Sequence, residues 1–562
     1  MPSPPPPHAP LRDVRAPASP SAREAVSRVA GILLPALACA AGVGLVLART
    51  PFGARITPDS VSYLATARHL LQGRGFATYN GDAYTEWPPL FPLAIAAGTA
   101  LLGDAHRAAT YINALAFGGL AAAASAWTWR RTRSPLTAAA VCAACLRSAP
   151  LVLVAVYAWS EPLYLLLSLL ALFALAAYDA QPRRARLVLA ALLSSAAMLT
   201  RYVGVAGIAT GGLLILLRPG STWPRRTVDA LLFGAIGIAG NVLWSLRNYH
   251  VAGNLTGGRK TAHIPLSHNV ALLLGTLGGW VLPAESADGM RIAAGAACVA
   301  AGIALAVLAG RMRDVRPALR PLVPPATYVV LYAALLLASA TLTPIDPVGD
   351  RLAVPLLAPA LVAAACAAHA LLARVRARRP RWALKLAAAG VFAVWVALAT
   401  GEDAEAAVIQ DPAEEAAARD WRQSDVGRWL HAHSLPGHVF SNDPWTLHMM
   451  TGRAVRLGPI VPRDRPALPT AAALQDYEDY LGDGPVWFVW LDRDPDGYPR
   501  TLVALAQRVA LLPVARLGDG VVYRLTDEED PLPRGGCLAG RPGERMCLAA
   551  VPRARIEKLT PR

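Results

Sequence analysis

Apolar runs of about 20 residues recur along this 562-residue chain. A helix of that length crosses a hydrocarbon core of about 30 Å. The composition agrees, because only 16% of the residues are charged, whereas soluble proteins usually carry about 25%. We therefore predict an α-helical polytopic membrane protein of about 11 transmembrane helices. The expected spans lie at 26–48, 108–129, 136–157, 161–179, 187–201, 203–217, 228–246, 290–310, 321–342, 352–373 and 383–400.

Arginine is concentrated in every second segment between these spans. The arginine-rich segments include "RRTR" at 130–133 and "RVRARRPRWALK" at 374–385. Short cytoplasmic loops carry an excess of Arg and Lys. The pattern thus predicts a multi-pass protein of the plasma membrane with a cytoplasmic N-terminus and an extracytoplasmic C-terminal region. It also accounts for the net charge of +16 without a nucleic-acid partner.

The remaining segments are of three kinds. Residues 1–25 are rich in proline and have no apolar face, which is typical of a disordered tail. Two apolar stretches, 90–102 and 270–282, are short for a crossing, and we expect helices lying at the outer membrane surface. Residues 401–562 are more polar and contain strand-like runs such as "PVWFVWL", so we predict a C-terminal soluble α/β domain. Outside the cytoplasm, Cys537 and Cys547 in its tail could form a disulfide.

The segment between the first two spans, 50–107, is the longest outer loop of the membrane domain 26–400. Asp59 and Ser60 follow Pro58, a pattern that indicates the start of a helix. Glu86 stands before Trp87 and a Pro-Pro turn. Asp59 alone would be explained as a helix cap, but a cap does not explain a long loop with a second carboxylate.

The loop resembles the first outer loop of the C-type (GT-C) glycosyltransferases, which use polyprenyl-phosphate sugars. The matching stretches are "DSVSYLATA", "GRGF" and "EWPPL", with Trp87 where the family commonly has lysine. The family includes protein O-mannosyltransferases and the aminoarabinose transferase of lipid A. Further matching stretches are "WSEPLYLLLSLLAL" (159–172), "TRYVG" (200–204), "WSLRNYHVAGN" (244–254) and "DRLAVPLLAP" (350–359).

The resemblance implies an inverting glycosyltransferase that moves a sugar from a polyprenyl-phosphate carrier to an acceptor at the outer face of the plasma membrane. Asp59 takes the role of the base that accepts the proton of the acceptor hydroxyl. Glu86 is the second catalytic candidate, and Glu161 stands at the outer end of a span, where an unpaired carboxylate is costly. Some relatives use a divalent cation, which Asp59, Glu86 and Glu161 would share through oxygen ligands. Alternatively, Glu161 is an acidic residue in the first turn of a helix, where the helix dipole stabilises a negative charge.

The leaving phosphate requires cationic side chains and other donors. Arg201 and Arg351 stand at span ends, where an arginine also reaches the interface for ordinary reasons. The candidates at the outer face are Arg201, Arg247, Asn248, Tyr249, Arg259, Lys260 and Arg351. The expected partners are the lipid-linked donor, membrane lipids and an acceptor that is a glycan, a lipid or a protein.

Two other functions remain open at this point. A membrane transporter or lipid-handling protein would have no transferase activity and would show inverted repeats with broken spans near the middle of the membrane. A membrane scaffold would act through the C-terminal domain. The clustering of candidate residues at the outer face favours the transferase.

Overall fold

The structure is a computed structural model, and it describes the chain in segments. These are 22–258, 261, 263–283, 285–312, 316–374, 424–458, 480, 484–492, 509–526, 537–539 and 545–547. Most of the expected tail, the expected span at 383–400, and Arg259 and Lys260 lie outside the described residues. The first helix begins at Ala22, within the expected tail.

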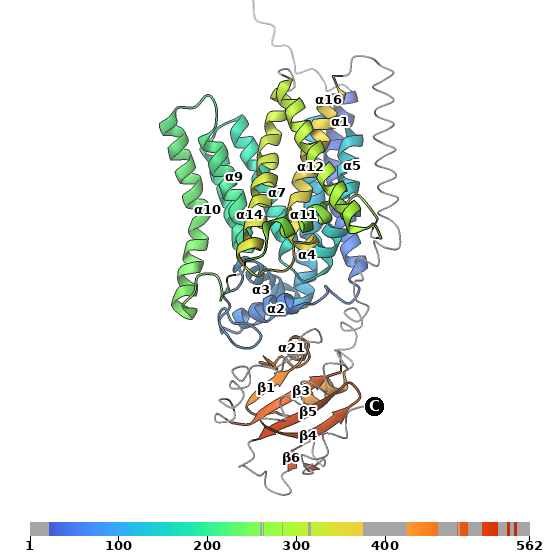
Figure 1. Cartoon of the computed structure of the whole chain (residues 1–562), viewed down its shortest axis with the longest axis vertical. Helices are drawn as coiled ribbons and strands as arrows, with labels where there is room; N and C mark the ends of the chain where they lie inside the picture. Colours follow the sequence, from blue (N-terminus) through green and yellow to red (C-terminus); the bar gives the residue numbers. More distant parts are fainter. Residues whose placement is uncertain are drawn as a thin grey trace, which may run out of the picture.

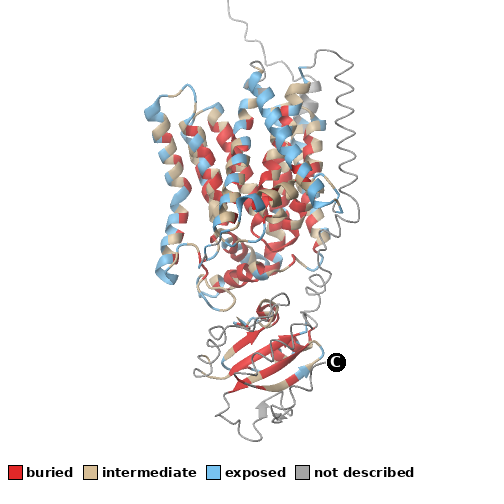
Figure 2. Ribbon diagram, viewed as in Figure 1, coloured by how far each residue is buried: buried red, intermediate tan, exposed pale blue. Residues whose placement is uncertain are grey.

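Long apolar helices form a bundle, as the hydropathy predicts (Figure 1). Figure 2 shows that buried residues concentrate in the middle of the bundle. The helices of the bundle are α1 (Ala22–Arg49), α4 (Ala105–Thr132), α5 (Pro135–Arg147), α6 (Ala149–Val156), α7 (Glu161–Ala180), α8 (Arg184–Thr200), α9 (Val205–Leu216), α10 (Trp223–Ala252), α11 (Leu266–Gly279), α12 (Asp288–Arg311), α14 (Val323–Leu342) and α16 (Leu357–Leu372). Short helical turns η1 (Tyr202–Gly204), α13 (Arg316–Leu319), η2 (Arg320–Leu322), α15 (Asp350–Ala353) and η3 (Val354–Leu356) lie between them.

The structure does not confirm the count of about 11 spans, and the expected span at 383–400 lies outside the described residues. Among the described residues, seven helices are long and apolar enough to cross a membrane, or eight if one bent pair counts as a span. The expected spans at 187–201 and 203–217 correspond to α8 and α9, which have only 17 and 12 residues. At about 1.5 Å per residue, α9 covers about 18 Å and does not reach across the hydrocarbon core by itself.

The bent pair replaces the single expected span at 136–157. Helices α5 and α6 meet at Ser148 with a bend of 54°. The Ser148 side chain accepts a hydrogen bond from the backbone N–H of Leu151, and Pro150 occupies the first turn of α6. A proline is tolerated in a first turn but not in a helix interior, so the chain starts a new helix here. Arg147 is the last residue of α5, at this break.

The segment between α1 and α4 is a structured module with its own apolar core. It contains α2 (Pro58–Leu71) and α3 (Leu90–Leu102), which pack against each other and against α4. The core includes Tyr63, Phe91 and Ile95 and also takes in Trp244 from α10. The module therefore lies at the end of the bundle where α10 ends (Figure 1).

The two short apolar stretches are helices, as expected. The first is α3, and the second is α11, which packs antiparallel against the first half of α12. Gly278 of α11 lies against the backbone of Arg291, and Gly295 of α12 lies against the backbone of Leu274, so the two helices approach closely. The position of α3 and α11 at the membrane surface stays a prediction.

The C-terminal region contains the predicted mixture of strands and helices (Figure 1). A sheet has the strand order β2-β1-β3-β5-β4, parallel among the first three strands and antiparallel among the last three. All six residues of β3 are buried, which fits a central strand. The elements are α20 (Asp425–Ala432), β1 (His438–Ser441), α21 (Pro444–Thr451), β2 (Arg456–Leu457), β3 (Val486–Leu491), β4 (Ala510–Leu517), β5 (Gly520–Thr526), β6 (Cys537–Ala539) and β7 (Arg545–Cys547).

The last two strands bear on the expected disulfide. Strands β6 and β7 are antiparallel, and Cys537 is the direct partner of Cys547. Partner Cα atoms in such a ladder are about 4.5–5.5 Å apart, which suits a disulfide. The side chains of these strands are outside the described part, so the bond itself stays a prediction.

Candidate active site

Asp59 lies in the first turn of α2 and is not its cap. The N-cap residue is Thr57, and Pro58 is the first residue of the helix. The Thr57 hydroxyl instead forms a hydrogen bond with Ser60 (3.1 Å) and accepts one from the indole N–H of Trp159 (2.7 Å). The Asp59 side chain is 25% exposed and forms an ion pair with Arg351. The interpretation of Asp59 as a simple cap is therefore wrong.

Arg351 joins the two acidic candidates that are farthest apart in the sequence. It belongs to α15, and its Nη2 donates to Asp59 while its Nε donates to Glu161 Oε1 over 2.6 Å. The guanidinium lies over the ring of Trp159, 4.1 Å from its centroid. Stacking on an aromatic face and paired hydrogen bonds fix a guanidinium in place. Arg351 is therefore held between Asp59 and Glu161.

Glu161 is the buried member of the cluster. It begins α7, and only 1% of its side chain is exposed. Its Oε1 also pairs with Arg201 at 2.8 Å, and Arg201 donates to the Ser160 hydroxyl at 3.1 Å. Within the described residues, the other oxygen, Oε2, has no hydrogen-bond partner. A buried carboxylate must be compensated, and two guanidinium groups compensate Glu161.

The four groups together are electrically balanced, and only one of the two carboxylates is open to solvent. Asp59 and Glu161 offset the charges of Arg201 and Arg351. Beside them, burial raises the pKa of the Tyr63 hydroxyl, and the negative charge of Asp59 raises it further. Tyr63 therefore remains a neutral phenol. We call Asp59, Glu161, Arg201 and Arg351 the carboxylate–arginine cluster.

Glu86 is not part of this cluster. Its side chain is exposed and lies against Gly257 in the loop after α10. Among the described residues, no three His, Cys, Asp or Glu side chains gather as a metal site. A divalent cation shared by Asp59, Glu86 and Glu161 therefore stays a prediction.

The side chains of Arg247 and Asn248 donate hydrogen bonds to backbone carbonyl oxygens of neighbouring loops. Arg247 donates to the carbonyl oxygens of Tyr84 (2.6 Å) and Phe76 (3.1 Å), and Asn248 donates to those of Thr85 and Leu255. Both residues therefore fix the shape of the first outer module. Tyr249 is 59% exposed. Phosphate contacts were expected for Arg247, Asn248 and Tyr249, and the structure gives the first two a structural role.

Trp87, which stands where the family commonly has lysine, packs into the same module. Its ring lies 5.5 Å from that of Tyr63 and 5.8 Å from that of Tyr84. Trp87 supplies apolar packing here and carries no charge to meet a phosphate. Burial also raises the pKa of Tyr84.

The sequence did not single out Trp159, Ser160 or Asp346 as site residues. Trp159 supports Arg351, Ser160 accepts from Arg201, and Asp346 lies 3.8 Å from Arg351. The first two precede Glu161 in the quoted stretch "WSEP". Because they stand next to a carboxylate at the end of a span, the sequence could have indicated them as site residues.

The chain is similar to several solved structures. The crystal structure of ArnT from Cupriavidus metallidurans in the apo state has 17% identity and a TM-score of 0.45, covering 89% of this chain and 98% of that one. ArnT from the same organism bound to undecaprenyl phosphate has 16% identity and a TM-score of 0.44, over 88% and 97%. The oligosaccharyltransferase AglB from Archaeoglobus fulgidus, in complex with an inhibitory peptide and a dolichol-phosphate, has 10% identity and a TM-score of 0.47, over 89% and 75%.

No family model matches the chain, and no curated protein matches it. TM-scores below 0.5 at these identities give no correspondence between residues. The residue roles proposed below therefore depend on the contacts of this chain.

Proposed function

We propose that this protein is an inverting glycosyltransferase that takes a sugar from a polyprenyl-phosphate carrier at the outer face of the plasma membrane. The observation that carries the proposal is the carboxylate–arginine cluster. It combines a partly exposed carboxylate, Asp59, with a guanidinium, Arg351, at the edge of the module that bears the family-like motifs. A base beside a phosphate-binding cation is what this transfer requires.

The reaction is a single displacement at the anomeric carbon of the donor sugar. The acceptor hydroxyl oxygen forms the new bond to this carbon, and Asp59 accepts the hydroxyl proton. The bond from the carbon to the phosphate oxygen breaks, and its electron pair stays on the polyprenyl phosphate. Arg351 stabilises the charge that develops on this leaving group. Attack opposite the leaving group inverts the anomeric configuration.

The ion pair between Arg351 and Asp59 would then change when the donor binds. A donor phosphate competes with Asp59 for the Nη2 of Arg351, because both are oxygen anions. Glu161 keeps its hold on the Nε of the same guanidinium, so Arg351 stays in place. Asp59 would be released toward the acceptor hydroxyl only in the donor complex.

The remaining assignments follow the same proposal. The N-terminus would lie in the cytoplasm, and residues 401–562 would lie outside it. Arg259 and Lys260, beyond the described residues, remain candidates for the phosphate because Arg247 is engaged by backbone carbonyls. A divalent cation, if one takes part, would have to bind with the donor phosphate.

The decisive experiment is a product assay on purified protein in detergent, with a panel of polyprenyl-phosphate sugars. The wild-type protein should transfer one of them. The Asp59→Asn variant should lose at least about a hundredfold in turnover, because positioned base catalysis is worth about 10² to 10⁴. Its amide is nearly isosteric and preserves the fold.

Asp346→Asn is the matched control. Asp346 also pairs with Arg351, but at 3.8 Å and with its side chain 75% exposed. It should retain nearly normal turnover. A folded Asp59→Asn variant with normal turnover would refute the role of Asp59. If the wild type transferred sugar from none of the donors, the proposed transferase activity itself would be contradicted.

A further inference from the structure

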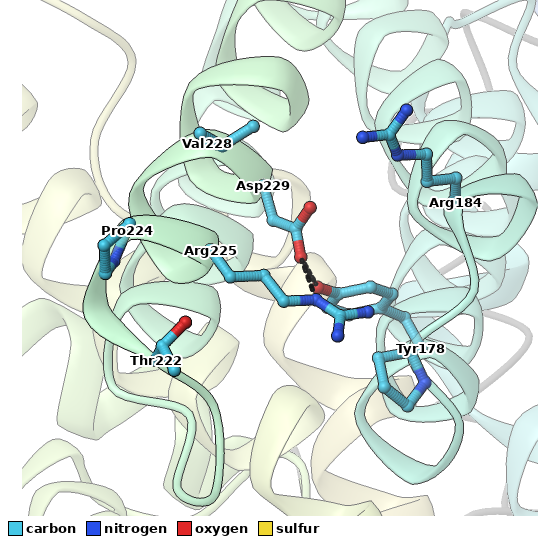
Figure 3. Close-up of a pocket in the computed structure, with 8 residues that line it drawn as sticks. Tyr178, Arg184, Thr222, Pro224, Arg225, Val228 and Asp229 are labelled. Carbon is cyan, nitrogen blue, oxygen red and sulfur yellow. Dashed lines mark hydrogen bonds and ion pairs between the residues drawn. The ribbon is translucent and has the colours of Figure 1, made fainter.

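The opposite end of the bundle contains a cavity that the proposed reaction does not use. It has a volume of about 460 Å³ and lies between the end of α7, the start of α8 and the start of α10 (Figure 3). Glu161 begins α7 and Tyr178 is near its end, so the cavity is about 25 Å from the cluster at 1.5 Å per residue. It is therefore a separate site.

Two arginines line the cavity from opposite sides. Arg184 extends from α8 and Arg225 from α10 (Figure 3). The one carboxylate in the lining, Asp229, accepts a hydrogen bond from the Tyr178 hydroxyl at 2.6 Å. Arg225 is 3.9 Å from Asp229, which is longer than a hydrogen bond. The lining thus has a net positive charge.

The neighbouring arginines at this end of the bundle donate hydrogen bonds to other groups of the protein, and among the described residues the two arginines of the cavity do not. Arg186 and Arg226 donate to backbone carbonyls, and Arg320 forms two hydrogen bonds with Asp179. In the part of the chain that the structure describes, neither Arg184 nor Arg225 donates a hydrogen bond to any group. Arg225 keeps its ion pair with Asp229 at 3.9 Å, so the hydrogen-bond donors of both guanidinium groups remain available to a ligand in the cavity.

An apolar stripe on α10 begins at the cavity. Val228 lines it and is 54% exposed, and Leu231, Ile238, Val242 and Leu246 continue the stripe. These positions recur at three-, four- and seven-residue intervals, which places them on one face of the helix. Figure 2 shows α10 at the edge of the bundle with exposed residues along its length. In a membrane, such a face contacts acyl chains.

We infer that this cavity binds the phosphate headgroup of an anionic membrane lipid, with the lipid chains lying along the apolar stripe of α10. Arg184 and Arg225 would donate to the phosphate oxygens, since guanidinium groups suit phosphate. The N-terminus of α10 adds backbone N–H groups, because its N-cap Thr222 lines the cavity and makes no side-chain cap. Basic pockets between transmembrane helices are known headgroup sites.

The test is a titration of the full-length protein in detergent with phosphatidic acid, with phosphatidylcholine and with inorganic phosphate. Binding is followed by the shift in thermal unfolding temperature. Phosphatidic acid should stabilise the wild type more than phosphatidylcholine does. Each cationic side chain near an anionic surface is worth about a fivefold change in affinity. The double variant Arg184→Gln/Arg225→Gln should therefore bind phosphatidic acid about 25-fold more weakly.

Arg183→Gln is the matched control, because it removes the same charge beside Arg184 but does not line the cavity. It should bind phosphatidic acid like the wild type. An equal loss in Arg183→Gln would mean general surface attraction and would overturn the site. Unchanged binding by the double variant would overturn it too, and equal stabilisation by inorganic phosphate alone would exclude a lipid as the ligand. None of these results depends on transferase activity.

Discussion

The two carboxylates of the carboxylate–arginine cluster differ in their exposure to solvent. Glu161 is 1% exposed and holds both guanidinium groups through one oxygen, whereas Asp59 is 25% exposed and holds only Arg351. A buried charge must be paired at all times, so Glu161 is suited to positioning the arginines. A partly exposed carboxylate can exchange its partner, so Asp59 is suited to proton transfer.

This division gives a stability prediction for Glu161→Gln. The substitution keeps the shape but leaves Arg201 and Arg351 without their buried counter-charge. Breaking a buried ion pair typically costs about 3–5 kcal/mol. We expect the free energy of unfolding in mixed micelles to fall by about 3 kcal/mol. Asp346→Asn, which removes an exposed partner of Arg351, should change it by less than about 1 kcal/mol. Equal effects of the two substitutions would show that burial does not distinguish them.

Sequence reasoning identified the members of the cluster but not their pairing. Asp59, Glu161, Arg201 and Arg351 were all candidates because each stands in a motif or at a span end. Arg351 is 292 residues from Asp59 in the chain, and no local pattern reports such a contact. The backbone contacts of Arg247 were missed for the same reason, because an arginine after a span has the same local sequence whether it faces a ligand or backbone carbonyls. Its expected phosphate contact stays a prediction.

At the scale of elements, the sequence predicted the helices well and their lengths less well. The apolar runs were recognised because a run of about 20 apolar residues is typical of a transmembrane helix. The break at Ser148 was missed because Pro150 lies in an apolar run that reads as one helix. The close approach of α1 and α4 was also missed, since it depends on which glycines face each other across the two helices, and hydropathy does not report such pairings.

The packing of α1 against α4 can be tested at two of these glycines. A Cβ on Gly118 of α4 would lie 2.5 Å from the carbonyl oxygen of Cys39, and one on Gly42 would lie 2.7 Å from the Cα of Gly118. Backbone atoms cannot move aside as a flexible side chain can. We expect Gly42→Ala and Gly118→Ala to destabilise the protein by about 1–3 kcal/mol, measured by thermal unfolding in detergent.

Gly44→Ala is the control on the same helix. Nothing lies within 4 Å of a Cβ at Gly44, so only the better helix propensity of alanine remains. This is worth at most about 1 kcal/mol in favour of the variant. If Gly42→Ala were as stable as Gly44→Ala, the helices would have to be farther apart than the structure places them.

At the scale of the whole molecule, the C-terminal region packs against the first outer module. Figure 1 shows α21 on the side of the sheet that faces α2, and the two helices are in contact. Met449 joins the apolar core that contains Tyr63, and Trp445 packs against it. The His448 ring lies 6.0 Å from that of Tyr79. The C-terminal region therefore covers the module that carries Asp59.

His448 makes the stability of this region depend on pH. It is 2% exposed, and its Nδ1 lies 2.7 Å from the carbonyl oxygen of Arg453. Burial lowers the pKa of His448, the hydrogen bond to the Arg453 carbonyl raises it, and the charges of Arg68 and His69 lower it, which together bring it to about 4. An unfolded histidine has a pKa of about 6.5. Between these values the unfolded state binds more protons, so stability falls as the pH drops from about 6.5 to about 4.

The prediction compares wild type with His448→Gln, which keeps a donor for the Arg453 carbonyl but does not titrate. Between pH 7 and pH 4.5 the wild type should lose about 2.5 kcal/mol more of its free energy of unfolding, measured by denaturation in detergent at each pH. Other groups titrate in this range as well, and the comparison cancels them. His431→Gln, at an exposed position of α20, should keep the wild-type slope. If His448→Gln shows the same slope as the wild type, His448 is not held neutral by the packing of α21, and this account of its burial fails.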